Sequence, residues 1–311
     1  MANGNFGGGT GTEENPYLIE DWVDWMAQTD DGETYYKLTA DLDGNDYNDG
    51  VWDKSKRIGF LDGNNHKLYN IKVSSDFAII VAGENTSVKN LIVTNVETSY
   101  YVIACDQAAD FTSCTFECTL SGSRPFYYGY SNNFTRGTFT DCQISISALA
   151  SISWLMSGRA SFYDCGIYCD CSSAASLGSG SNTYGYPYFY RCDIVANNCA
   201  LSQWVSFYMC RVKCKTKITS NSNYIIGGMI ANSIFVLDLS ESTVLSNFNV
   251  QSNGGTATDP TYTGISIIDT DLLGEYAVLK ETDYLKGLTT EQMQDIDALK
   301  ASGFTNVVEV V

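Results

Sequence analysis

The sequence predicts an all-β solenoid, a single-stranded parallel β-helix with a short helical cap at its N-terminal end and an α/β cap at its C-terminal end. Three observations indicate this fold: a short motif recurs about every 22 residues, cysteines recur inside that motif, and turn-forming residues are frequent. The 311 residues include 27 glycines and only 4 prolines, and 13% are aromatic, which is typical of a β-rich chain.

The first 54 residues are predicted to form a flexible arm and a capping segment. The stretch "NGNFGGGTGT" is rich in glycine and lacks the lysine of a phosphate-binding loop, which favours an arm. Asp21 is a candidate N-cap for a short helix with an apolar side. Because a solenoid exposes backbone and core at its open end, we expect this helix to act as a lid.

A six-residue pattern extends through residues 55–252, the predicted β-helix. It reads apolar, any residue, Asn/Asp/Ser, small or apolar, any residue, apolar, as in "FTDCQI" and "FYDCGI". Self-similarity at such a period is the signature of a solenoid. The nine copies begin at Leu68, Val88, Phe111, Phe139, Phe162, Phe189, Phe207, Ile230 and Leu245.

Each copy is interpreted as a strand, a two-residue corner and a second strand. The fourth and sixth positions, such as Cys142 and Ile144, lie two residues apart and therefore share one face of a strand. The first position joins that face only if the chain bends between them. The third position is Asn, Asp or Ser in seven of the nine copies, and these residues tolerate left-handed or turn geometry. The bend is therefore predicted at the third position.

Cysteine fills the fourth position of five successive copies. The chain has 11 cysteines, an odd number, and no secretory signal is recognised, so we expect reduced thiols. No CxxC pair is present and His66 is the only histidine, so no metal site and no cofactor are predicted. The two predicted inward columns are Cys114, Cys142, Cys165, Cys192 and Cys210, beside Phe111, Phe139, Phe162, Phe189 and Phe207.

Two long connections carry the candidate ligand-binding residues. Residues 124–133, "RPFYYGYSNN", and residues 179–189, "SGSNTYGYPYF", are rich in tyrosine and glycine. Longer connections project from a solenoid, and solvent-facing tyrosine rings suit stacking on sugar rings. The alternative is that these rings pack against the coil wall or a neighbouring subunit. The candidates are Tyr127, Tyr128, Tyr130, Tyr184, Tyr186 and Tyr188.

Residues 253–311 are predicted to form a closing cap, with an oligomerisation element as the alternative. "LTTEQMQDIDALKASGF" predicts one helix, with Thr289 as N-cap and Gln292 at the capping-box position. Ile296 and Leu299 are expected to face inward.

The net charge of −18 is unevenly distributed along the chain. Residues 1–110 carry −12, residues 111–250 carry +1 and residues 251–311 carry −7. Because DNA and anionic membranes require a basic partner surface, neither nucleic acid nor a membrane is expected as a partner. No apolar stretch approaches the ~20 residues of a membrane helix, and we expect synthesis in the cytosol.

The repeat resembles the right-handed parallel β-helix of the pectate-lyase-like superfamily, including its internal stack of asparagines at one corner. This likeness covers residues 55–252. Within residues 9–73, "GTGTEENPYLIEDWVDWM", "YYKLTADLD" and "GFLDGNNHKLYNIKV" are similar to the opening segment of β-helices common in gut-bacterial and bacteriophage surface proteins.

The resemblance implies three alternative functions. The first is a non-enzymatic bacteriophage virion component, such as a tail or head fibre, a spike or a decoration protein, that binds host-surface or mucosal polysaccharide. The second is a phage polysaccharide depolymerase on the same scaffold, and the third is a purely structural virion rod. A virion location, contacts with other virion proteins and a homotrimer are expected by the same resemblance.

A depolymerase acting by glycoside hydrolysis needs two carboxylates about 5–9 Å apart. Asp141 and Asp164 occupy the third position in adjacent copies and form the candidate catalytic pair. The alternative is a structural role in a corner ladder, because asparagine fills the same position in other copies.

Overall fold

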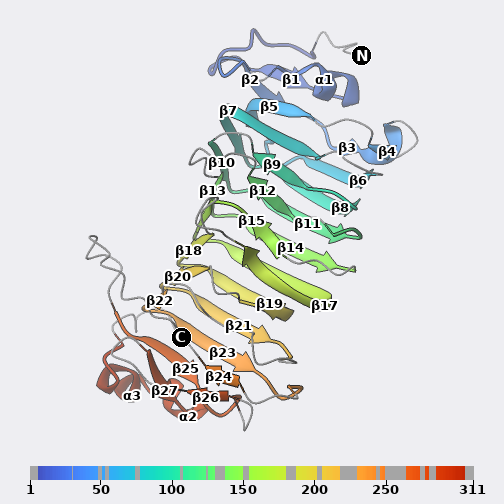
Figure 1. Ribbon diagram of the computed structural model, residues 1–311. Helices are drawn as coiled ribbons and strands as arrows, with labels where there is room; N and C mark the ends of the chain where they lie inside the picture. The colour runs from blue at the N-terminus through green and yellow to red at the C-terminus, as the bar shows by residue number, and fades with distance from the viewer. Residues whose placement is uncertain are drawn as a thin grey trace.

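The computed structural model is an all-β parallel β-solenoid whose coils stack from the N-terminal end to the C-terminal end (Figure 1). Every strand of its main sheet pairs in parallel with a strand of the next coil, which confirms the fold class predicted from the repeat. The structure describes residues 6–29, 31–47, 51–52, 56–73, 78–105, 108–123, 125–129, 137–149, 154–179, 187–201, 205–217, 230–242, 246–248, 264–273, 277–279 and 285–304.

The first face of the solenoid holds the strands that precede the predicted corner. Phe139 pairs with Phe111 of the preceding coil and with Phe162 of the following coil, so equivalent residues lie in register. This ladder already includes residues 17–38 and therefore begins before residue 55. Its strands are β1 (Tyr17–Ile19), β2 (Tyr35–Leu38), β5 (Arg57–Asp62), β7 (Ile80–Lys89), β10 (Ala109–Thr112), β13 (Gly137–Thr140), β16 (Ala160–Tyr163), β18 (Tyr188–Tyr190), β20 (Ser206–Tyr208) and β22 (Ile230–Ala231).

The second face holds the strands that follow the corner. Its ladder continues past residue 252, because β25 and β27 pair with the coils before them. Its strands are β3 (Leu42–Asp43), β4 (Val51–Trp52), β6 (Lys67–Val73), β8 (Ile92–Thr98), β11 (Thr115–Leu120), β14 (Gln143–Ala148), the first half of β17 (Gly166–Ser179), β19 (Asp193–Ala200), β21 (Arg211–Lys215), β23 (Ile234–Asp238), β25 (Ser266–Asp269) and β27 (Leu285–Leu288).

A third face closes the coils on the remaining side. It contains the first residues of β7, the second half of β17, and β9 (Ile103–Cys105), β12 (Tyr127–Gly129) and β15 (Trp154–Ser157). A separate parallel pair near the C-terminal end consists of β24 (Ser246–Phe248) and β26 (Ala277–Leu279), and a short 3-10 helix, η1, spans Gly44–Asp46.

The corner between the first two faces is formed by a residue in the left-handed backbone region, as the sequence predicted. A backbone N–H at the corner donates to a carbonyl of the next coil, for example from Asp141 to Tyr163 at 3.0 Å. The third-position residues of eight copies have φ between 49° and 57°: Asn70, Asn90, Ser113, Asp141, Asp164, Arg191, Met209 and Asn232.

Two copies of the pattern do not belong to this corner column. Asn70 lies within the second face beside Asn95 of the next coil, and the Asn95 amide donates to the Asn70 side chain. In the corner column, the position one coil before Asn90 is occupied by Gly63. A Cβ atom at Gly63 would meet the backbone of Asn90 and Leu91 in the next coil. Asn247 lies within β24, so the ninth copy forms a strand and not a corner.

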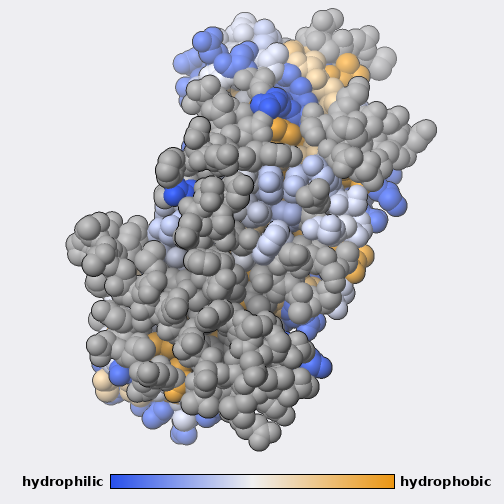
Figure 2. Space-filling view, viewed as in Figure 1, coloured by the Kyte–Doolittle hydropathy of each residue, from blue (hydrophilic) through white to orange (hydrophobic). Residues whose placement is uncertain are grey.

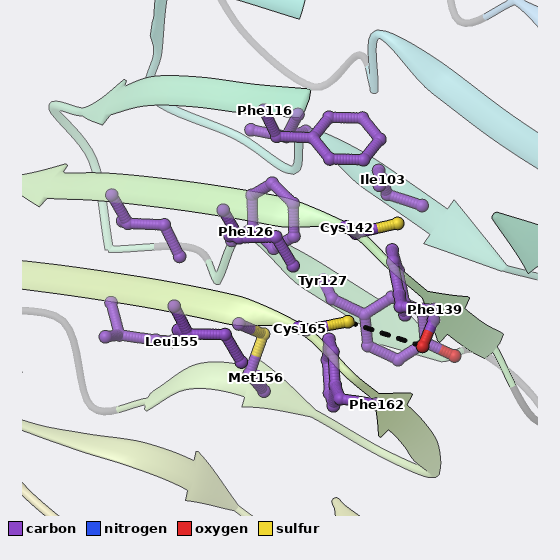
Figure 3. Close-up of a cluster of buried hydrophobic side chains, with 14 of the residues drawn as sticks. Ile103, Phe116, Phe126, Tyr127, Phe139, Cys142, Leu155, Met156, Phe162 and Cys165 are labelled. Carbon is purple, nitrogen blue, oxygen red and sulfur yellow. Dashed lines mark hydrogen bonds between the residues drawn. The ribbon is translucent and has the colours of Figure 1, made fainter. Parts of the chain in front are cut away.

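Side chains alternate between the inside and the outside of the coils. In Figure 2, weakly polar residues lie over the coils that follow the N-terminal end, and strongly hydrophilic residues lie near both ends of the solenoid. Inside, the five phenylalanines of the predicted column are fully buried and stack with their rings nearly parallel, and Figure 3 shows two of them, Phe139 and Phe162. Ring centroids are 4.8 Å apart from Phe111 to Phe189 and 5.5 Å apart between Phe189 and Phe207.

All eleven cysteines are buried free thiols, and the predicted column of five lies inside the coils. Each thiol of the column donates a hydrogen bond to a backbone carbonyl near the corner, as Cys165 does to Phe139 at 3.4 Å (Figure 3). Ser233 continues the column and donates to the Ala231 carbonyl in the same way. The column therefore combines packing with satisfaction of buried carbonyl groups.

The N-terminal lid is the helix α1 (Trp22–Ala27), which lies at the top of the stack in Figure 1. Asp21 is its N-cap and accepts hydrogen bonds from two backbone N–H groups of the first turn. Trp22 and Trp25 are buried in the main core, so the apolar side of the helix covers the first coil.

The C-terminal segment forms two short helices where the sequence predicted one. These helices are α2 (Thr290–Met293) and α3 (Ile296–Ala301). The capping box predicted at Thr289 and Gln292 is present and begins α2. Asp295 then caps α3 with its own side chain, so the chain starts a second helix instead of extending the first.

The second helix packs on the outside of the solenoid. Leu299 is 2% exposed and contacts the outward-facing Ile234 and Ile267 of β23 and β25, together with Phe304. The expectation that Ile296 faces inward is wrong, because its side chain is 46% exposed. The helices therefore shield an apolar patch on the second face near the last coils.

Candidate functional site

The first predicted ligand-binding residue, Tyr127, belongs to the core. It is fully buried, its ring lies edge-on to Phe139 at 5.8 Å, and burial raises the pKa of its hydroxyl well above the usual value. The hydroxyl donates to the Arg159 carbonyl at 2.9 Å and accepts from the Gly137 N–H at 3.0 Å. Tyr127 pairs with inward residues of β9 and β15, so the strand alternation turns its ring away from solvent.

The next residue, Tyr128, points outward and stays partly exposed. Its ring stacks on Tyr101 with centroids 4.6 Å apart, and Tyr100 lies beside Tyr101 at 4.2 Å. These rings pack against Ala78 and Ala104 in a small apolar cluster on the third face. One ring face of Tyr128 is therefore already covered by another tyrosine.

Tyr188 also lies on the outside, beside a ladder of stacked tyrosines on the first face. Tyr163 and Tyr190 stack at 4.7 Å, Tyr190 and Tyr208 at 5.0 Å, and Tyr188 lies 6.5 Å from Tyr190. Neighbouring rings cover the faces of the ladder, and a sugar stacks on a ring face and not on its edge. The remaining candidates, Tyr130, Tyr184 and Tyr186, lie outside the described residues.

The candidate catalytic pair lies at the corner, where Asp141 and Asp164 have φ of 53° and 55°. The Arg191 guanidinium donates two hydrogen bonds of 2.6 Å to the Asp164 carboxylate. These hydrogen bonds and the positive charge of Arg191 lower the pKa of Asp164. A lowered pKa does not suit the acid of a glycosidase, and both oxygens of the Asp164 carboxylate are bonded to Arg191, which favours a structural role for Asp164.

Metal ligands are not gathered in the described part of the chain: no group of three or more His, Cys, Asp or Glu side chains is placed to hold an ion. His66 instead forms a 2.9 Å contact with the Asp41 carboxylate. Within the same described residues, every helix is too short or too polar to cross a membrane.

A hollow that the sequence did not reveal opens on the outer side of the second face, over β11, β14, β17 and β19, with a volume of about 390 Å³. We call it the central hollow. Gly166 interrupts an outward row in which it pairs with Gln143 on one side and Asp193 on the other. The Gln143 amide occupies the position that a side chain at Gly166 would take. Tyr168 and Glu117 complete the polar and aromatic lining.

Tyr168 is the aromatic residue of the central hollow, and its side chain is 42% exposed. Its neighbours in the outward row are Ser145 and Val195, so among the residues that the structure describes no aromatic ring covers either of its faces. The Asn197 amide donates to the Tyr168 hydroxyl at 3.4 Å and helps to hold the ring in place. An open ring face beside carboxylate and amide groups is the lining that sugar rings require.

The two carboxylates of the central hollow are arranged for binding and not for hydrolysis. Glu117 and Asp193 lie three strands apart, which corresponds to roughly 14 Å across the sheet. This separation exceeds the distance that either glycosidase mechanism needs. Asp193 also accepts two hydrogen bonds from the Arg211 guanidinium, one of 3.0 Å, which fixes the carboxylate in position.

One feature of the sequence could have indicated the central hollow. In "CGIYC" the two inward cysteines flank the outward residues Gly166 and Tyr168. This is the only copy of the pattern in which glycine and tyrosine take these two outward positions. The six-residue pattern is defined mainly by inward-facing and corner positions. It therefore cannot predict which outward-facing residues of four neighbouring coils lie side by side.

Comparison with known proteins gives little similarity beyond the fold. No protein-family model matches the chain, and no curated protein matches it. A solved structure from Bacteroides ovatus, described as "a putative immunoglobulin A1 protease", aligns with 78% of this chain and 84% of its own at 18% identity, with a TM-score of 0.39. A likeness of this size assigns neither a family nor an activity. The all-β parallel solenoid is established by the strand pairing of the chain itself.

Proposed function

We propose that this chain is a non-catalytic glycan-binding component of a bacteriophage virion, such as a fibre, spike or decoration protein. The observation that supports glycan binding is the central hollow, with the open ring of Tyr168 beside the Gln143 amide and the Asp193 carboxylate. The phage context rests on the similarity of residues 9–73 to the opening segment of β-helices common in gut-bacterial and bacteriophage surface proteins. Host-surface or mucosal polysaccharide is the proposed ligand.

A rigid solenoid suits attachment because its binding residues project from ordered strands and need little ordering when a ligand arrives. In this proposal other virion proteins hold the rod at one end, and a homotrimer multiplies a weak sugar contact by avidity. The polysaccharide depolymerase receives less support, because Asp164 of the corner pair is engaged by Arg191 and the carboxylates of the central hollow are far apart.

Glycan-array screening followed by calorimetry tests the proposal. We expect Tyr168→Ala to weaken binding of the best neutral glycan by roughly tenfold, equivalent to ~1.4 kcal/mol, because the stacking surface is removed. Tyr163→Ala is the matched control, since this tyrosine is also outward but belongs to the stacked ladder. Gly166→Ala should also weaken binding, because the added methyl group displaces the Gln143 amide.

Three results would contradict the proposal. Glycan binding that survives Tyr168→Ala unchanged would remove the central hollow as the binding site. Absence of binding to any glycan would favour the structural rod. Release of reducing or unsaturated ends from a bound polysaccharide would show that the chain is a depolymerase.

A further inference from the structure

A second hollow, of about 260 Å³, lies on the outer side of the first face at the N-terminal end of the solenoid. We call it the N-terminal hollow. Its floor is formed by outward side chains of β2, β5 and β7, and one wall is formed by the loop that precedes β1. It shares no lining residue with the central hollow, which lies on the second face several coils away.

The floor of the N-terminal hollow is aromatic. Tyr35 and Phe60 stack with centroids 4.4 Å apart and an interplanar angle of 12°. In the next coil the residue paired with Phe60 is Ser87, whose small side chain ends the aromatic stack. Within the described part of the chain, the second ring face of Phe60 is therefore not covered by another ring, as at Tyr168 in the central hollow.

The wall is held in place by backbone hydrogen bonds. The Tyr35 N–H donates to the Gly11 carbonyl at 2.9 Å, and Thr10 and Asn15 close the loop on itself. Glu13 projects from this loop into the lining and is exposed. Because the loop is already ordered on β2, a ligand would meet a preformed carboxylate.

The charge of the N-terminal hollow is negative. The Asp62 carboxylate is fixed by the Asn64 N–H at 2.9 Å and the Asn90 amide at 3.1 Å, and it lies 3.7 Å from the Lys89 ammonium. Glu13 has no ion-pair partner within the part of the chain that the structure describes, so the lining carries an excess negative charge. The surrounding 110 residues have a net charge of −12, which strengthens the attraction for cations.

We propose that the N-terminal hollow is a second saccharide site that takes an amino sugar with a free, protonated amine, an inference that rests on the proposed glycan-binding function. The apolar face of the sugar ring would stack on the open face of Phe60, and the ammonium group would lie toward the Glu13 carboxylate. The rod would then carry two saccharide sites, one in its neutral middle and one at its acidic end.

The probes are a glucosamine trimer and the same trimer fully N-acetylated, titrated into the full chain at about pH 6. We expect the glucosamine trimer to bind more tightly, because acetylation removes the positive charge. Glu13→Gln should weaken its binding about threefold to fivefold, and Phe60→Leu about fivefold to tenfold. Glu14→Gln is the matched control: it removes an exposed acid from the neighbouring position, which does not line the hollow.

Four outcomes would overturn this inference. They are equal affinity for the two trimers, equal effects of Glu13→Gln and Glu14→Gln, loss of trimer binding in Tyr168→Ala, and equally strong competition by trilysine. Folding of each variant is checked by its circular dichroism and its retained binding at the central hollow. If the glucosamine trimer fails to bind while a neutral glycan still binds through Tyr168, this inference fails and the proposed function stands.

Discussion

The middle coils and the N-terminal coils share one parallel ladder but fill their interiors differently. In the middle coils the column beside the corner repeats phenylalanine, and rings in register stack at 4.8 Å. In the N-terminal coils the same column holds Leu61 and Val88. Repetition of one residue allows each coil to pack against an identical copy, whereas the terminal coils must also fit the lid helix α1.

The two regions also hold their carboxylates by different means. In the middle, Asp164 and Asp193 are each paired with an arginine of the next coil. Near the N-terminal end, hydrogen bonds from the backbone of Glu33 and from Thr34 lower the pKa of Asp31 to about 2 without a cation. Burial raises the pKa of Asp24, which belongs to the lid helix α1. The middle is near neutral because its acids and bases are almost equal in number, whereas the N-terminal end has an excess of acids.

The largest expected effect tests the packing half of this comparison. Phe162→Ala should reduce the free energy of unfolding by about 3–5 kcal/mol, because it leaves a cavity between two stacked rings. Val88→Ala in the N-terminal part of the same column removes fewer carbon atoms and should cost about 1.5–3 kcal/mol. Urea denaturation followed by circular dichroism measures both values.

Tyr163→Ala is the control for the phenylalanine column, because Tyr163 follows Phe162 on the same strand and points outward. Its loss removes one contact of the outer ladder and should cost about 0.5–1.5 kcal/mol. Equal costs for Phe162→Ala and Tyr163→Ala would contradict the inward column as the main source of stability in the middle coils.

A smaller effect is expected from exchanging corner residues between the two regions. Met209 has φ of 55°, a conformation that costs an ordinary side chain about 1–2 kcal/mol and costs asparagine less. Met209→Asn should therefore stabilise the middle coils by about 0.5–1 kcal/mol, and Asn90→Met should destabilise the N-terminal coils by about 1–2 kcal/mol. Thermal unfolding of the two variants shows the sign directly, and destabilisation by Met209→Asn would contradict the conformational explanation.

The comparison also shows which features can be predicted from sequence. The phenylalanine and cysteine columns were predictable because the same residue recurs at each level, and the corners because Asn, Asp and Ser favour left-handed geometry. The first coil was misaligned, because Asn70 lies at a second left-handed position that has the same local pattern as Asn90. The six-residue pattern alone cannot distinguish the position of Asn70 from that of Asn90, because they differ only in which residues of the neighbouring coils they pair with.

Less of the candidate site could be predicted. Tyr127 and Tyr128 are adjacent and identical in type, yet strand alternation on the third face buries one ring and exposes the other. The central hollow depends on Gly166 and Tyr168 lying next to particular residues of three other coils. Such a row of outward neighbours is set by the register of the whole ladder, so no single stretch of sequence contains it.

The smallest expected effect concerns the paired carboxylate of the middle coils. Hydrogen bonds from Arg191 lower the folded-state pKa of Asp164 below its unfolded value, near 3.9. The stabilisation is therefore complete above the unfolded pKa and is lost as pH falls through the folded pKa. Because both side chains are partly exposed, Asp164→Asn should cost less than ~1 kcal/mol at pH 7.

Urea midpoints measured between pH 7 and pH 2 test this prediction. The difference between the unmodified chain and Asp164→Asn should shrink below about pH 4 and vanish once the aspartate is protonated in the folded state. Arg191→Gln should reduce the pH dependence of the urea midpoint in the same way, because it removes the side chain that lowers the pKa of Asp164. If the difference stays constant down to pH 2, the carboxylate of Asp164 is not held by the arginine, and the contrast with the hydrogen-bonded acids of the N-terminal end is lost.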